Sequence, residues 1–445
     1  MGLTPPAALT AAEAARLIAV GSLTSQQWVQ ACLARIDERE PAVQAWQYLD
    51  ASNALEQARE RDAHRARGGP LGPLHGVPVG IKDIIDTADM PTENGSVLHA
   101  GRQPLRDARL VARLRSAGAV ILGKTVSTEF ATYTAGKTRN PHDLTRTPGG
   151  SSSGSAAAVA DGMVPLAVGT QTNASIIRPA SFCGVYGFKP SIGVISCDGA
   201  LVMSPTLDTI GLFARSLDDI ALLFETLSAA HATDPATWQP ASLAFAPTRD
   251  DPAQVAPRLA FVKTPVWGRA DEATRSAFND LSARLGPQCE EVVLPEGMLQ
   301  AWDWHKTVME AEMAVSLDPE WHGGRDRLSP SLRSQLGRGR AILALDYQQA
   351  LAGRVRLCAD LAKLLAGFDA IITPATCGTA PPFASTGDPV FGTLWSLCGM
   401  PAISLPLLTG GDGLPLGVQL VGLRGGDAAL LRTARWLDTH LRSMA

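Results

Sequence analysis

Short apolar runs alternate with helical stretches along most of the chain. Each run is bounded by Gly, Pro or charged residues, which is typical of a buried strand. The runs that predict strands are VPVGIKDII, AGAVILGKT, VPLAVGTQT, LAFVKTP (Leu259–Pro265) and FDAIITPAT (Phe368–Thr376). Helices are predicted over Leu217–Ser228, over Asp271–Leu285 and from Asp427 to the C-terminus. This alternation predicts an α/β fold, with one large domain whose mixed, twisted β-sheet is covered on both faces by helices.

The N-terminal region predicts two helices. Thr10–Glu13 (TAAE) and Thr24–Gln27 (TSQQ) are capping-box patterns, in which two side chains satisfy backbone N–H groups at the start of a helix. Trp28, Cys32 and Ile36 then recur every four residues, which predicts one buried stripe.

Charge and cysteine content exclude several classes of protein. The chain has 39 Lys and Arg against 43 Asp and Glu, a net charge of −4, and no basic cluster, so we expect no nucleic-acid partner. Its 7 cysteines are an odd number without a CxxC pair, which disfavours a disulfide scaffold or a zinc site. We expect reduced thiols in a cytoplasmic protein, with no metal and no other cofactor.

No targeting or membrane segment is expected. The start, MGLTPPAALTAAEAARL, has no basic region and contains a Glu, unlike a signal peptide. No apolar run reaches the length of a membrane span, so we expect no membrane partner.

Gly118–Thr125, GAVILGKT, matches the phosphate-loop pattern letter by letter. In a phosphate loop the residues between the glycines form a turn whose amides face the phosphates. Here those residues are Ala119 to Leu122, which favour a strand, and the residues before them favour a helix. The context therefore disfavours a nucleotide site.

Gly150–Gly154, GSSSG, matches the nucleophile elbow of Ser-His-Asp hydrolases. An elbow needs a strand that leads into the serine, and the residues before Gly150 are NPHDLTRTPG, which predicts a loop. None of the eight histidines stands in a context that suggests a partner for such a serine. This interpretation is disfavoured too.

Lys82 lies in GIKDIID, between an apolar run and Asp83. Taken alone, an ion pair with Asp83 at the strand end is the favoured interpretation, because lysine is rarely buried without a partner. Two serine segments change this interpretation: Ser151 in PGGSSSGS and Ser175 in GTQTNASIIRPASFCGVYGFKPS. A lysine can activate a serine only when it is neutral, so it must lie in a dry, prearranged pocket.

With these segments the sequence resembles the amidase signature family over most of its length. The matching blocks, in order, are HGVPVGIKDIID…TENGS, AGAVILGKTVSTEFA, NPHDLTRTPGGSSSGSAAAVADG, GTQTNASIIRPASFCGVYGFKPS, SPTLDTIGLFARSLDDIALL and CGMPAISLP…GLPLGVQLVG. The separations of 69 residues from Lys82 to Ser151 and 24 residues from Ser151 to Ser175 suit the family's Ser–cis-Ser–Lys triad. The resemblance implies that Ser175 forms an acyl-enzyme, that Ser151 relays the proton and that Lys82 is the base.

The resemblance also implies the surroundings of the triad. The Gly150–Ser151 peptide is expected to be cis, and the backbone N–H groups of Thr172, Asn173, Ala174 and Ser175 are expected to form the oxyanion hole. For Ser152 two roles stay open, support of the site by hydrogen bonding and capping of the next helix. Ser153 and Ser155 are expected to cap that helix.

The nucleophile segment departs from the family pattern G-T-D-T-G-G-S-I-R. Gln171 replaces the Asp, Asn173 and Ala174 replace the Gly pair, and Ile177 replaces the Arg, which here follows at Arg178. Loss of both members of the Asp–Arg ion pair is coherent, because loss of one would leave a buried charge. The Ala174 side chain puts the geometry of the oxyanion hole in question.

We expect one domain over residues 1–445 with four parts. These are an N-terminal helical part over 1–65, the signature catalytic core over 66–230, a surface excursion over 231–258 and a C-terminal part over 259–445 that completes the sheet and pocket. Tyr133, Met203 and Trp395 are plausible pocket residues, although each could equally belong to the core. Cys183 is expected to be core.

The favoured function is a stand-alone hydrolase of small amides, with esters and carbamates as further options. The first alternative is the glutaminase subunit of a tRNA-dependent amidotransferase, against which the missing Asp and Gly pair weigh. The second is a binding protein that has the fold but impaired catalysis. The expected partners are a small-molecule substrate and water, and the oligomeric state, including a homodimer, stays open.

Overall fold

The computed structural model describes residues 8–228, 256–294 and 296–444. Within these residues, eleven strands form one sheet in the order β1-β3-β2-β4-β6-β5-β10-β11-β9-β7-β8. The strands are β1 (Trp46–Leu49), β2 (Pro78–Lys82), β3 (Val120–Thr125), β4 (Leu166–Gln171), β5 (Tyr186–Lys189), β6 (Thr209–Ala214), β7 (Leu259–Val262), β8 (Cys289–Val292), β9 (Ala370–Pro374), β10 (Ala402–Thr409) and β11 (Pro415–Val421).

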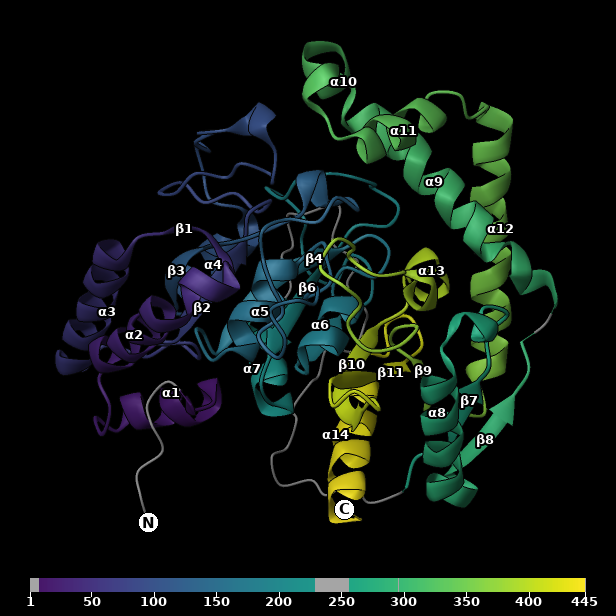
Figure 1. The fold of residues 1–445 in the computed structure, drawn as a ribbon. Coiled ribbons are helices and arrows are strands. Elements are labelled where there is room, and N and C mark those ends of the chain that lie inside the picture. Colours follow the sequence, from purple (N-terminus) through teal and green to yellow (C-terminus); the bar gives the residue numbers. More distant parts are fainter. Residues whose placement is uncertain (1–7, 229–255, 295, 445) are drawn as a thin grey trace.

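Fourteen α-helices are found in the same residues. They are α1 (Ala11–Ala19), α2 (Ser25–Val43), α3 (Ala51–Ala66), α4 (Arg109–Ser116), α5 (Ser153–Ala160), α6 (Ile177–Cys183), α7 (Leu217–Ser228), α8 (Glu272–Leu285), α9 (Ala301–Ser316), α10 (Asp318–Gly324), α11 (Pro330–Gly339), α12 (Ala344–Leu365), α13 (Val390–Leu397) and α14 (Asp427–Ser443). Helices α9 to α12 gather at one side of the molecule (Figure 1), where α9 contacts α11, α12 and α13.

The sheet is mixed, as the sequence predicts. Strand β2 pairs in parallel with both β3 and β4, and β7 pairs in parallel with both β8 and β9. The strands between these two groups pair antiparallel. Because β2 and β4 are parallel neighbours, residues at their carboxyl ends come together at one edge of the sheet.

Helices cover both faces of the sheet, which successive residues of β5 demonstrate. A Cβ atom on Gly187 would lie 2.3 Å from Ala180 Cβ of α6, so α6 rests directly on the backbone of this face. The next residue, Phe188, makes an edge contact with Phe224 of α7, with ring centroids 5.2 Å apart. Since successive strand residues point to opposite faces, α6 and α7 lie on opposite faces.

The five predicted strands are confirmed as β2, β3, β4, β7 and β9. Helix α7 has the predicted bounds, and α8 begins one residue late because Asp271 is its N-cap and accepts a hydrogen bond from Thr274 N. Both predicted capping boxes are present, at Thr10 and at Thr24. The part over 1–65 also contributes β1, and most of the excursion over 231–258 lies outside the described residues.

Candidate active site

The structure brings Lys82 and Ser151 into direct contact. Lys82 ends β2, and Ser151 lies in the loop that leads into α5. Lys82 Nζ donates hydrogen bonds to Ser151 Oγ at 2.7 Å and to Thr170 Oγ1 of β4 at 2.9 Å. Both Lys82 and Ser151 are almost completely buried. The parallel pairing of β2 with β4 therefore places the lysine among hydroxyl groups.

The ion pair between Lys82 and Asp83, which is the prediction for Lys82 taken alone, is wrong. Asp83 instead lies 3.6 Å from Lys124 Nζ, which comes from the neighbouring strand β3. Burial lowers the pKa of Lys82 well below its ordinary value, and only the charge of Asp208 acts in the opposite direction. The surroundings of Lys82 thus favour the neutral form of its amine.

Ser175 lies between β4 and α6 in a loop with free backbone donors. Within the described residues, the N–H groups of Thr172, Asn173, Ala174 and Ser175 donate no hydrogen bond, and Ser175 Oγ has no partner. Such a row of free amides can bind an oxyanion. The two amides that follow the nucleophile are satisfied, because Gln171 Oε1 accepts hydrogen bonds from Ile176 N at 2.8 Å and Ile177 N at 3.1 Å.

The departures from the family pattern have local explanations. Gln171 satisfies the start of α6, and its Nε2 donates to Ser396 Oγ at 2.9 Å, so no carboxylate is left there without an arginine. Neither Asn173 nor Ala174 has a positive φ, so glycine is not required at either position. A Cβ on Gly392 of α13 would lie 2.7 Å from Ala174 Cβ, so this glycine makes the space that Ala174 occupies.

Side chains from distant segments hold the loop that carries Ser175. His305 of α9 is buried, which lowers its pKa to about 4, so its neutral ring donates from Nε2 to Thr172 O at 3.0 Å. Thr172 Oγ1 donates to Asp208 Oδ1 at 2.6 Å. Thr393 of α13 donates to Asn173 Oδ1 at 2.8 Å. His305, Asp208 and Thr393 are site residues that were not predicted from the sequence, where only the SPTLDTIG block around Asp208 offered a signal.

The serine cluster is attached to strands. The Gly150–Ser151 peptide is cis, as the resemblance implied. Ser152 Oγ donates to Thr170 O and accepts from Thr170 N, so its supporting role is favoured over side-chain capping. The prediction that Ser153 and Ser155 cap the helix is wrong. Ser153 Oγ donates to Val126 O, just after β3, and Ser155 Oγ donates to Val168 O of β4, so both hydroxyls bond to carbonyls of other segments instead of helix amides.

Two neighbouring hollows lie beside the loop that carries Ser175, and Ser175 lines the inner one. The inner one has a volume of about 10 Å³, and its walls include Ser175, Arg178, Tyr133 and Met203. The outer one has a volume of about 280 Å³ and shares Tyr133, Asn173, Met309 and Gln335 with the inner one. Tyr133 and Met203 are thus pocket residues, whereas Trp395 belongs to the core. The outer hollow therefore adjoins the inner one, which Ser175 lines.

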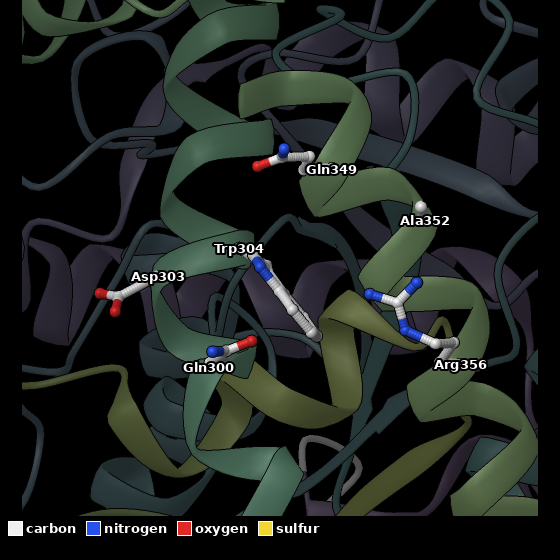
Figure 2. Close-up of a pocket in the computed structure, with 6 residues that line it drawn as sticks. All are labelled: Gln300, Asp303, Trp304, Gln349, Ala352 and Arg356. Carbon is white, nitrogen blue, oxygen red and sulfur yellow. The ribbon is translucent and has the colours of Figure 1, made fainter. Parts of the chain in front are cut away.

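A larger hollow lies elsewhere. It has a volume of about 540 Å³ and lies between α9 and α12, and Figure 2 shows the side chains that line it, among them Trp304 and Arg356. None of its residues belongs to the predicted triad or to the loop that carries Ser175. We therefore place the candidate active site at the smaller hollow beside Ser175.

The other candidate motifs remain structural. Gly118–Thr125 is mainly strand β3, not a phosphate-binding turn, and a loop leads into Ser151. Cys183 is buried, and burial raises the pKa of its thiol. The described part of the chain contains no group of three His, Cys, Asp or Glu side chains placed to hold a metal ion. It also has no helix both long and apolar enough to cross a membrane.

Comparison with known proteins agrees with this geometry. The sequence model described as Amidase matches residues 27–431. The chain belongs to the amidase family. The peptide amidase from Stenotrophomonas maltophilia is 29% identical, with a TM-score of 0.83 and 98% of each chain covered. A structure described as a vestigial protein complex that reveals the evolutionary origins of an s-triazine catabolic enzyme is 28% identical, with a TM-score of 0.89, covering 97% of this chain and 98% of that chain.

The curated relatives are named as amidotransferase subunits, unlike the peptide amidase above. One subunit of the glutamyl-tRNA(Gln) amidotransferase from Symbiobacterium thermophilum is 34% identical over 96% of this chain and 95% of its own length. Similarity to that protein favours the glutaminase alternative over the stand-alone hydrolase of small amides. Because the relative's name includes a tRNA, the expectation that this amidase-family chain has no nucleic-acid partner is left without support.

Proposed function

We propose that this chain hydrolyses the carbon–nitrogen bond of a carboxamide through an acyl-enzyme on Ser175. The observation that carries the proposal is the fully buried Lys82 amine, bonded to Ser151 Oγ at 2.7 Å. Hydroxyl partners and burial favour the neutral amine, which is the form that can accept a proton. The unpaired amides around Ser175 supply the second requirement, a place for the oxyanion.

In the proposed first half-reaction, Ser175 Oγ bonds to the carbonyl carbon of the substrate. Its proton passes to Ser151 Oγ while the Ser151 proton passes to Lys82 Nζ. The carbonyl oxygen becomes an oxyanion and accepts hydrogen bonds from the free amides of the Ser175 loop. When the C–N bond breaks, the proton returns from Lys82 through Ser151 to the departing nitrogen.

In the second half-reaction, a water molecule attacks the acyl group on Ser175. The water proton passes through Ser151 to Lys82, the new C–O bond forms, and the ester bond to Ser175 breaks. Ser175 Oγ recovers its proton by the same path, and the carboxylic acid leaves. Esters and carbamates pass through similar tetrahedral intermediates, so we infer that they are further substrates to test.

Two classes of amide substrate have to be distinguished. The curated relatives favour glutamine, cleaved by a glutaminase subunit that works with partner chains and a tRNA. The similarity to a peptide amidase supports a stand-alone enzyme. Gln171, Asn173 and Ala174 distinguish this chain from the usual family pattern. The binding of either substrate must be compatible with these three residues.

The experiment is a paired assay of the purified protein and Ser175→Ala. Aryl amides, p-nitrophenyl esters, aryl carbamates and L-glutamine are the substrates, with Ser153→Ala as the matched serine control. We expect turnover that Ser175→Ala abolishes and Ser153→Ala retains. Release of ammonia from glutamine by the isolated chain would favour the glutaminase, whereas turnover confined to aryl amides would favour the stand-alone hydrolase. Turnover that survives in Ser175→Ala would contradict the proposal.

A further inference from the structure

Two buried side chains, each with one unpaired polar atom, line the inner hollow beside Ser175. They are Arg178, from the first turn of α6, and Gln335, from α11. Arg178 is 1% exposed and Gln335 is 5% exposed. Within the described residues, Arg178 Nε and Gln335 Oε1 are both buried atoms without a hydrogen-bond partner. One is a donor and the other an acceptor, and both border the space where a substrate must lie.

Arg178 is a buried cation without a carboxylate in direct contact, although the charge of Asp388 acts on it from a greater distance. Its guanidinium donates to Gly387 O at 3.0 Å and Gly150 O at 2.8 Å, with a long contact of 3.5 Å to Thr386 Oγ1. None of the ion pairs within the described residues includes Arg178. Burial lowers its pKa to about 10, so the side chain remains charged at neutral pH. An arginine has five N–H donors, and these three contacts leave some of them free.

Such groups are costly when they stay unpaired. A buried polar atom without a partner destabilises the fold by about 1–3 kcal/mol, and a buried charge without a counter-charge by more. A buried polar atom without a partner in a native structure calls for an explanation, and one explanation is a bound partner that completes its hydrogen bonds. The ligand that suits an arginine is a carboxylate, which accepts two parallel hydrogen bonds from the guanidinium.

The inner hollow encloses only about 10 Å³, so its walls must move apart to admit the carbon chain of such a ligand. Its walls include the apolar side chains of Met203, Met309 and Met313. Thioether side chains adapt to flexible methylene chains. Gln335 also borders the outer hollow, where its Oε1 can accept a hydrogen bond from an N–H group of the ligand.

We propose that Arg178 and Gln335 form a polar subsite for the acyl part of the substrate. Arg178 binds a carboxylate on that part, and Gln335 accepts a hydrogen bond from an adjacent N–H group. The acyl part is assigned because it stays bonded to Ser175 in the acyl-enzyme and so occupies the hollow that Arg178 lines. This inference rests on the proposed function, and it restricts the substrate to carboxamides of a dicarboxylic or amino-dicarboxylic acid.

Three p-nitroanilides of equal chain length test the subsite. The γ-glutamyl anilide carries both a carboxylate and an ammonium group, the glutaryl anilide carries only the carboxylate, and the valeryl anilide carries neither. We expect kcat/KM to fall in that order. Arg178→Met should reduce the glutaryl-to-valeryl ratio at least tenfold, and Gln335→Leu should reduce the γ-glutamyl-to-glutaryl ratio. Arg340→Met, whose arginine pairs with Asp318 at the surface, is the matched control and should leave both ratios unchanged.

Equal losses on all three substrates in Arg178→Met would overturn the proposal, since they would mean that Arg178 only positions Gly150. A wild-type preference for the valeryl anilide would also overturn it. A second measurement does not depend on turnover: in the Ser175→Ala background, calorimetry should show that Arg178→Met raises the Kd of the glutaryl anilide at least tenfold, and an unchanged Kd would contradict the subsite. Turnover that persists in Ser175→Ala would instead contradict the acyl-enzyme, so the two failures are distinguishable.

Discussion

Two buried lysines lie on neighbouring strands and have opposite surroundings. Lys82 ends β2, and Lys124 lies on β3, paired in register with Ile81. Both side chains are fully buried. Lys82 Nζ contacts the hydroxyl groups of Ser151 and Thr170. Lys124 Nζ contacts two backbone carbonyls and two threonine hydroxyls, with the Asp83 carboxylate 3.6 Å away.

The partners determine the charge of each amine. A neutral amine has two N–H donors and one acceptor position, so the two hydroxyl contacts of Lys82 can be satisfied without a charge. Lys124 needs a third donor and has a carboxylate beside it. Burial lowers the pKa of Lys124 to about 8 against the opposing charge of Asp83, and it lowers the pKa of Lys82 well below its ordinary value with only Asp208 acting in the opposite direction. Equal burial therefore produces a candidate base in one place and a structural cation in the other.

The largest effect that we expect comes from Lys82→Met. Loss of the base should lower kcat/KM on an aryl amide by about 10²–10⁴-fold, because general-base catalysis contributes in this range. The melting temperature should fall less than in Lys124→Met, since no charged partner is left behind. Steady-state kinetics and thermal unfolding of the same preparation check both parts. Activity within a few fold of wild type would remove Lys82 from the reaction.

Lys124→Met should show the reverse pattern. Its removal leaves the buried Asp83 carboxylate without its cation, which we expect to reduce the free energy of unfolding by about 3–5 kcal/mol. Denaturant unfolding measures this loss. The folded fraction should retain its KM and kcat per active site, as determined by titration of Ser175. A stable Lys124→Met variant without turnover would contradict the claim that Lys124 is structural and Lys82 catalytic.

The pH dependence of kcat/KM should report the lowered pKa of Lys82. The base acts only when it has lost its proton, so activity should rise with pH and level off well below 10.5, the ordinary pKa of lysine. Burial also raises the pKa of Asp208 to about 6, so Asp208→Asn is the control. Because the Asp208 charge raises the pKa of Lys82, this variant should move the acid limb to lower pH. Disappearance of the limb would assign it to Asp208.

The smallest effects should come from single hydroxyl partners. Thr170→Val removes one acceptor from Lys82 and should lower kcat/KM by about fivefold, equivalent to about 1 kcal/mol for one hydrogen bond. Thr92→Val removes one acceptor from Lys124 and should cost about 1 kcal/mol of stability without a change in kcat/KM. Kinetics should therefore show a loss of kcat/KM only in Thr170→Val, and denaturant unfolding should show the loss of stability in Thr92→Val. Identical results for both variants would contradict the different roles of the two lysines.

The local features of the fold and of the site were predictable from the sequence. Apolar runs predict β2, β3 and β4, and the family blocks point to Lys82, Ser151 and Ser175. Contacts between distant segments were not predictable, because nothing near His305 or Gln335 in the sequence indicates that α9 and α11 reach the Ser175 loop. The capping prediction for Ser153 and Ser155 is wrong for the same reason. The local pattern predicts that the two serine hydroxyls bond to helix amides, whereas in the fold they donate to carbonyls of other segments.

The central claim is that Ser175 becomes acylated, and this can be observed directly. The protein would be mixed with an aryl ester, quenched in acid, digested and analysed by tandem mass spectrometry. Fragment ions must locate the acyl group, because no Lys or Arg separates Ser151 from Ser175. We expect the acyl group on Ser175 and none in Ser175→Ala. An acyl group on Ser151 or Ser152 in the unmodified sequence, with Ser175 free, would contradict the account.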